Sequence, residues 1–187
     1  MIRKNKMRVY LLFVILQLLF CSYLVPGEDN KTNIDKSLQQ QKLWENELKS
    51  LVLEIREAIL KHDVKRLLSY IDGDGLICTD TQVPSAEIEN NLKDKSSKLY
   101  LSLFESERFA KECADKYSAE YPPISEREFF MKVVDPKMKV SFTGQSWARV
   151  TISSPLPQHY PREWLFHRTN GKWRLSSGFI SRGCSCG

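Results

Sequence analysis

The strongest constraint on the fold is a change of hydrophobic period at Pro136. Before this residue, apolar side chains recur at spacings of three and four, which is the period of helices that bury one face. After it, Met138, Val140 and Phe142 alternate with polar residues, which is the period of a strand with one buried face. Because helices precede the strands rather than alternate with them, the chain is predicted to have an α+β fold.

The first helical pattern begins at Lys42. Its apolar positions fall on one helical face, and they are Trp44, Leu48, Leu51, Val52, Ile55, Ala58 and Ile59. We expect this helix to end near His62 and a second short helix to continue to Ile71. Gly73 and Gly75 then stop the helical pattern.

Two further helix starts lie before the strands. Ser85 follows a proline and is the predicted N-cap of a helical region. Ser125 and Glu128 have the capping-box spacing, in which each side chain satisfies a backbone donor of the other residue. These patterns predict helices in the region between the glycine-rich turn and Pro136.

The segment after Pro136 predicts an antiparallel meander. A turn at residues 143–145 leads into a strand whose buried side carries Ala148, Val150 and Ile152. Asn170 and Gly171 separate two later strand patterns, and this dipeptide favours a tight hairpin because both turn positions need positive φ. Residues 42–187 are long enough for a single domain with one core.

These C-terminal strands resemble those of the nuclear transport factor 2-like superfamily, which has a cone-shaped α+β fold. The similar features are the alternating strand, the strand with Trp147-Ala148-Arg149-Val150 and the hairpin that ends in residues 170–175. Residues 51–68 also resemble the opening helix of that superfamily. The resemblance implies N-terminal helices packed on a curved C-terminal antiparallel sheet. The superfamily includes isomerases and dehydratases as well as domains that only bind, so it does not select a function.

The N-terminus predicts export. Four basic residues lie within the first eight positions, and an apolar run over residues 9–20 follows them, which is the order found in a secretory signal peptide. Residues 1–27 are therefore interpreted as a signal peptide or, alternatively, an uncleaved membrane anchor. Both interpretations place the body outside the cytoplasm, in the periplasm or at the cell surface. Cleavage before Glu28 and lipid modification of Cys21, which would attach the protein to a membrane surface, are both left open.

The charge of the chain argues against nucleic acid as a partner. The formal net charge is +5, but residues 1–27 hold four basic and no acidic residues, so residues 28–187 carry only +1. Nonspecific nucleic-acid binding needs a concentrated basic surface. Residues 28–41 are polar and lack apolar periodicity, and they are predicted to form a tether.

Four cysteines remain after Cys21: Cys78, Cys113, Cys184 and Cys186. An even number in an exported domain favours disulfides. A bond between Cys184 and Cys186 would close a very small ring, so pairings of these two with Cys78 and Cys113 are geometrically easier. The alternative is that Cys184 and Cys186 form a redox pair or bind a soft metal.

Few residues predict catalysis. His167 lies on a strand, where a carboxylate such as Asp135 or Glu163 could pair with it for proton transfer. The three histidines have no metal-ligand spacing, and neither a metal site nor a cofactor is predicted. The aspartates and glycines of residues 72–75 are interpreted as a turn rather than a calcium loop, because the rest of the EF-hand signature is missing.

The sequence therefore predicts a noncatalytic exported domain that binds a small molecule or a protein of the cell envelope. The first alternative is a small-molecule enzyme of the isomerase or dehydratase type with an acid–base pair. The second is a thiol-redox or soft-metal protein acting through Cys184 and Cys186. Formation of a homodimer is left open.

Overall fold

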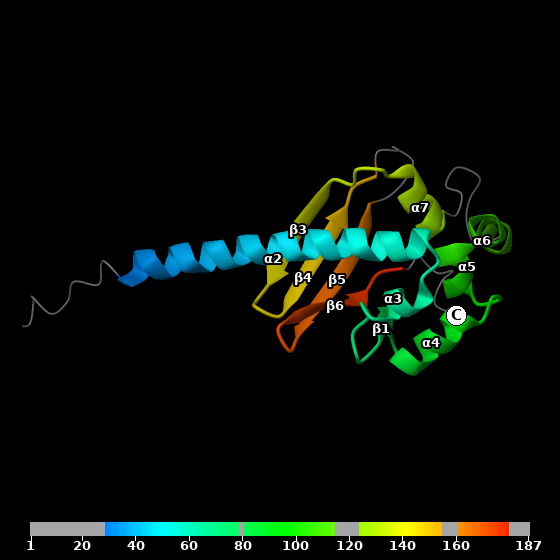
Figure 1. Cartoon of the computed structure of the whole chain (residues 1–187), viewed down its shortest axis with the longest axis horizontal. Coiled ribbons are helices and arrows are strands. Elements are labelled where there is room, and N and C mark those ends of the chain that lie inside the picture. The colour runs from blue at the N-terminus through cyan, green and yellow to red at the C-terminus, as the bar shows by residue number, and fades with distance from the viewer. Residues whose placement is uncertain (1–28, 79–80, 115–123, 155–160, 180–187) are drawn as a thin grey trace, which may run out of the picture. The chain divides into compact units, whose positions relative to one another are not determined.

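The computed structural model describes residues 29–78, 81–114, 124–154 and 161–179 (Figure 1). The chain divides into two compact units, residues 1–43 and residues 44–187. The predicted signal peptide, including Cys21, lies outside the described residues, so its processing stays a prediction. Within the described ranges, none of the helices has both the length and the apolar character that crossing a membrane requires.

Helix α2 (Asp29–Leu60) is longer than the sequence pattern predicts. The segment 29–41, which is predicted to form a polar tether, is helical, and its described side chains are exposed. Adding a residue to an existing helix costs much less than starting one, and Lys, Gln and Leu are good helix formers. The helix therefore extends ahead of its apolar face. The boundary between the units falls at residues 43 and 44, close to the predicted start of the domain.

Within the second unit, α2 packs on the sheet through the predicted apolar face (Figure 1). Leu48, Val52, Ile55 and Ile59 are fully buried. The ring of Trp44 lies 6.1 Å from that of Phe142 and 6.0 Å from that of Trp173, both on strands. These aromatic contacts join the beginning of the buried helical face to both edges of the sheet.

The sheet contains strands β3 (Met138–Thr143), β4 (Trp147–Ile152), β5 (Arg162–Thr169) and β6 (Lys172–Ser177). They pair antiparallel in the order β3-β4-β5-β6, which confirms the predicted meander and the α+β fold. Asn170 and Gly171 have φ values of 52° and 76°, as the predicted hairpin requires. The inner face, which packs against α2, includes Val150 and Phe166. The opposite face, here called the outer face, includes Trp147 and His167.

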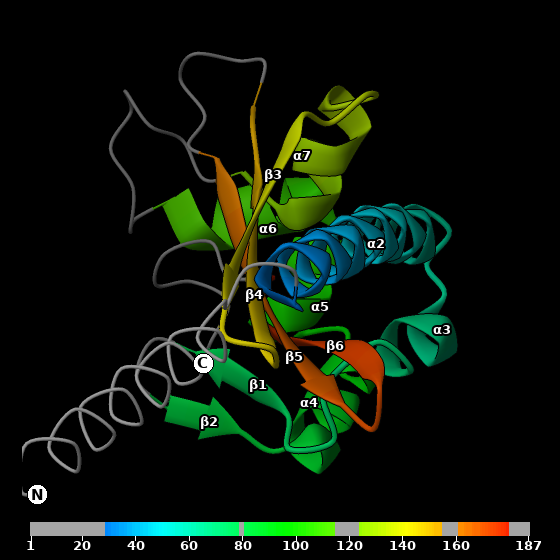
Figure 2. The same ribbon diagram turned by 90° about the vertical axis from the view of Figure 1, so that its left-hand side faces the viewer.

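A short hairpin that the sequence analysis did not predict lies beside β6 (Figure 2). It consists of β1 (Leu76–Cys78) and β2 (Thr81–Val83), and it follows the short predicted helix α3 (Val64–Leu68). The predicted turn at residues 72–75 is confirmed by a bond from the Gly75 N–H to the Asp72 carbonyl. Ile71 makes a parallel bridge to Leu175, so the chain just before this turn extends the sheet beyond β6.

The remaining helices are α4 (Ser85–Lys93), α5 (Lys98–Phe104), α6 (Ser106–Cys113) and α7 (Glu126–Lys132). The predicted N-cap at Ser85 is wrong, because Pro84 occupies that position and Ser85 is the first helical residue. The Ser85 hydroxyl instead donates to the carbonyls of Asp72 and Gly73. Ser125 caps α7 as predicted, with its hydroxyl oxygen accepting from the Glu128 N–H at 3.0 Å.

Candidate functional site

The buried polar side chains of the described residues fall into two clusters. They are Asp72, Ser102, Ser125, Glu126 and Ser176. Asp72 contacts both Ser176 and His167, whereas Ser102, Ser125 and Glu126 lie together near Arg162. Burial of a polar group costs free energy unless the group is paired. These two clusters are therefore the candidates for a functional site.

The first cluster, here called the His167 cluster, contains Asp72, Trp147, His167, Thr169 and Ser176. The Asp72 Oδ2 atom lies 3.0 Å from His167 Nδ1 and 3.1 Å from Ser176 Oγ. The other oxygen of the carboxylate accepts from the Asp74 N–H at 3.3 Å. The side chain of Asp72 is only 6% exposed, whereas that of His167 is 29% exposed. A buried carboxylate thus holds an imidazole that solvent can reach.

Backbone pairing explains how Asp72 reaches this position. The Asp72 N–H donates to the Leu175 carbonyl at 2.9 Å, and the Leu175 N–H donates to the Tyr70 carbonyl at 2.8 Å. The pairing of β5 with β6 shifts register between Leu165 and Phe166, which leaves Ser176 in a bulge. Bulges redirect side chains, and here the Ser176 hydroxyl meets the Asp72 carboxylate.

Trp147 fixes the plane of the imidazole. It lies opposite His167 in the β4–β5 ladder, and the two rings stack with centroids 4.3 Å apart and planes at 16°. The Nδ1 atom faces the Asp72 carboxylate, and which of the two groups donates depends on the tautomer of the ring. Thr169 Oγ1 also lies 3.2 Å from Nδ1. Among the described residues, the hydrogen bonds of the His167 ring involve Nδ1.

The structure gives His167 a different carboxylate partner from the two that were predicted. Asp135 is exposed in the loop between α7 and β3, and no ion pair among the described residues joins it to His167. Glu163 is exposed and lies 3.7 Å from Arg149. The predicted pairing of His167 with Asp135 is therefore replaced by one with Asp72. The sequence suggested only a turn at Asp72, because a parallel bridge between residues 71 and 175 has no local sequence signal.

The second cluster is built on an ion pair inside the core. Glu126 Oε1 lies 2.9 Å from Arg162 Nε, and the two side chains are 0% and 15% exposed. The alignment is not that of a hydrogen bond, and no described residue makes one to either oxygen of the carboxylate. Burial raises the pKa of Glu126, and the charge of Arg162 acts in the opposite direction. The pair joins α7 to β5, and its inaccessibility favours a structural role.

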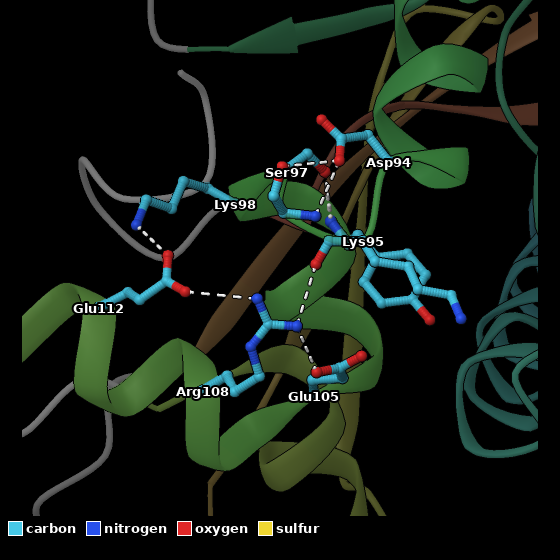
Figure 3. A network of polar contacts seen from close by, with 9 residues as sticks. Asp94, Lys95, Ser97, Lys98, Glu105, Arg108 and Glu112 are labelled. Carbon is cyan, nitrogen blue, oxygen red and sulfur yellow. Dashed lines mark hydrogen bonds and ion pairs between the residues drawn. The ribbon is translucent and has the colours of Figure 1, made fainter.

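A third group of charges lies on the surface of α5 and α6 (Figure 3). Lys98 and Glu112 form an ion pair at 2.8 Å, and Arg108 contacts Glu105 at 2.8 Å and Glu112 at 3.6 Å. The hydrogen bond from Lys98 lowers the pKa of Glu112. These charges are paired with one another and partly exposed, so they tie neighbouring helices together and do not form a site.

His62 was interpreted from the sequence as a residue near a helix end, and it lies just after α2. Its φ is 60°, and its ring stacks on Phe104 with centroids 4.0 Å apart. Burial lowers the pKa of His62, and the charge of Arg127 acts in the same direction. These contacts explain His62 through packing.

Two of the disulfide candidates lie among the described residues. Cys78 ends β1 and Cys113 ends α6; both are buried and disulfide-bonded. Cys184 and Cys186 lie outside the described residues, so the pairing scheme stays a prediction. Within the described ranges, no group of three or more His, Cys, Asp or Glu side chains is arranged to hold a metal ion.

The fold and the His167 cluster define an α+β domain with a histidine–carboxylate pair on the outer face of its sheet. No family model matches the sequence, and no curated protein matches it either.

Proposed function

We propose that this chain is an exported binding module of the cell envelope and that it takes its ligand at the His167 cluster. The proposal includes the nuclear transport factor 2-like fold that the sequence resembles. Helices followed by a four-strand antiparallel meander support that fold. The basic and apolar order of residues 1–20 supports export, and so does disulfide bonding at Cys78 and Cys113, because such bonds persist in oxidising compartments.

The observation that carries the binding proposal is the stack of Trp147 on His167. Both rings are only half-buried on the outer face, although every other tryptophan of the described residues is buried in the core. The indole and the imidazole, stacked face to face, form a small aromatic cluster, and Nε2 adds one polar position at its edge. Binding sites combine apolar surfaces with a few fixed polar groups. We therefore expect a small planar ligand that carries a hydroxyl or amino group.

A second candidate function, a small-molecule enzyme with an acid–base pair, is favoured by one observation. The 3.0 Å contact between Asp72 and His167 is the arrangement in which a carboxylate orients a histidine base. A thiol-redox or soft-metal function at Cys184 and Cys186 would depend on residues outside the described ranges, and no contact described above favours it.

Fluorescence of Trp147 tests the binding proposal. Subtracting the emission of a Trp147→Phe variant from that of the wild type isolates the signal of this indole. A panel of planar hydroxy- and amino-substituted ring compounds is titrated against both proteins, with open-chain alcohols as the comparison set. We expect at least one ring compound to change the emission of the wild type and to leave that of Trp147→Phe unchanged.

Thr151→Ala is the matched control, because Thr151 lies on the outer face of the same strand and opposite Glu163 rather than His167. This variant should respond as the wild type does. If no ring compound alters the wild-type emission, or if Trp147→Phe responds equally, the proposed ligand class at this surface is refuted.

A further inference from the structure

We propose that His167 is a catalytic base whose Nε2 atom takes a proton from an O–H group of a bound molecule. This inference rests on the proposed function, since it places its substrate at the same cluster. It adds a reaction class, namely proton abstraction from a hydroxyl group or from a water molecule that adds to the substrate.

The tautomer of His167 follows from its carboxylate partner. The Nδ1 atom faces the Asp72 carboxylate at 3.0 Å and therefore carries a proton. In a neutral imidazole the second nitrogen then has a free lone pair. The hydroxyl of Ser176 and the N–H of Asp74 hold the carboxylate in place, so the tautomer is fixed before any substrate arrives.

The position of Nε2 is restricted by the neighbours of the ring. The ring cannot turn freely, because Trp147 stacks on it and Thr169 lies beside Nδ1. The side chain is nevertheless 29% exposed, and among the described residues the hydrogen bonds of its ring involve Nδ1. A base must come within hydrogen-bond distance of the proton that it removes, and a group bound at the edge of the Trp147–His167 stack meets this condition.

The positive charge that proton transfer places on His167 is balanced within the cluster. When the substrate O–H bond breaks, its electron pair stays on the oxygen and the proton moves to Nε2. The imidazolium that forms lies against the negative charge of Asp72, which stabilises it. Arg174 pairs with His167 in the β5–β6 ladder, and its guanidinium donates a hydrogen bond to the Ser69 carbonyl. The proton on Nε2 returns to the product or to solvent, so no oxidant or reductant is needed.

Nuclear magnetic resonance of the wild-type protein gives the first test. Long-range ¹H–¹⁵N spectra at neutral pH distinguish the two imidazole tautomers, and a His167→Gln variant identifies the signals of this residue. We expect His167 to have the Nδ1–H form with an unprotonated Nε2. An Nε2–H form would overturn the proposal, and the tautomer itself is measured in the wild-type protein.

Diethyl pyrocarbonate gives the second test, because its carbonyl carbon is attacked by an unprotonated imidazole nitrogen. The attack forms an N–C bond at Nε2 and expels monoethyl carbonate, which decomposes to carbon dioxide and ethanol. The rate at His167 is followed by peptide mass spectrometry. In Asp72→Asn we expect it to fall at least about tenfold, because the carboxylate that favours the reactive tautomer is gone. Glu163→Gln is the control, since it removes an exposed carboxylate from the same strand and should leave the rate unchanged.

The outcomes separate the two proposals. An Nδ1–H tautomer and a slowed Asp72→Asn variant, without any response of Trp147 to the ring compounds, would reject the proposed ligand class and retain the orientation of His167 by Asp72. A Trp147 response with an Nε2–H tautomer would do the reverse. If His167 reacts with diethyl pyrocarbonate as fast in Asp72→Asn as in the wild type, Asp72 does not orient the ring and the inference fails.

Discussion

At the scale of single residues, the two buried carboxylates show how surroundings decide what an acid can do. Asp72 has donors from a histidine ring, a hydroxyl and a backbone N–H, so its charge is compensated where it lies. Glu126 has one ion pair with Arg162 and no hydrogen bond from a described residue. A buried carboxylate with several hydrogen-bond donors can orient a partner side chain. One with too few donors mainly lowers the stability of the fold when it is ionised.

The first residue-scale prediction concerns the pH dependence that Glu126 gives to stability. Its pKa is raised in the folded protein, so between 4.5 and the folded value the native state binds more protons than the unfolded state. Stability contributed by the neutral form is therefore lost as the pH rises through that window. Glu126→Gln does not titrate. We expect the free energy of unfolding of the wild type to fall relative to this variant as the pH rises above 4.5, measured by urea unfolding.

Comparing the wild type with Glu126→Gln cancels the contributions of other titrating groups to the pH dependence of stability. His62 has a lowered pKa, so the stability that it contributes is present above 6.5 and lost as the pH falls below that value. This contribution is shared by the wild type and by Glu126→Gln, and it cancels in their difference. Glu128→Gln, which removes the carboxylate that Lys132 contacts on the surface of α7, keeps the buried pair and should follow the wild-type curve. A wild-type advantage that grows with pH would mean that Arg162 outweighs burial.

At the scale of elements, the predictable parts are those with a long repeating pattern. Local sequence predicts the buried face of α2, the alternation of β3 and β4, and the Asn170–Gly171 turn. The β1–β2 hairpin has three residues in each strand, which is too short for a recognisable alternation. The partner of His167 was missed for a related reason, since Asp72 reaches it through a contact across 95 positions of sequence.

Gly75 provides the element-scale prediction, because it holds the turn between Asp72 and β1. Its φ is +101°, and a Cβ atom there would lie 1.9 Å from the Val83 carbonyl oxygen of the facing strand. Gly75→Ala must therefore displace the hairpin, and we expect a loss of about 2 to 4 kcal/mol in the free energy of unfolding. Urea unfolding monitored by circular dichroism measures it.

Gly73 is a matched control in the same turn. A Cβ atom at this position would meet nothing within 4 Å, and φ is not positive. Gly73→Ala should change stability by less than about 0.5 kcal/mol. Equal losses in the two alanine variants would show that the crowding at Gly75 is relieved without cost and would contradict the expected fit between the turn and β2.

At the scale of the whole molecule, the question is where the folded body begins along α2. The described side chains from Asp35 to Leu43 are exposed, whereas Trp44 is the first residue of the buried core. Leu38 and Leu43 are each 58% exposed although they are apolar. The helix thus continues without interruption from a segment that contributes nothing to the described core into one that forms part of it.

A pair of chains tests this boundary. A chain that begins at Gln40 keeps one helical turn ahead of Trp44 and loses only residues outside the core, so its melting temperature should stay within about 2 °C of that of a chain that begins at Glu28. Trp44→Ala in the longer chain removes ring contacts to Phe142 and Trp173 and the Arg168 guanidinium 4.7 Å above the indole. It should cost about 3 to 4 kcal/mol. If the shortened chain loses as much stability as Trp44→Ala does, the residues before Trp44 stabilise the body and the boundary lies further toward the N-terminus.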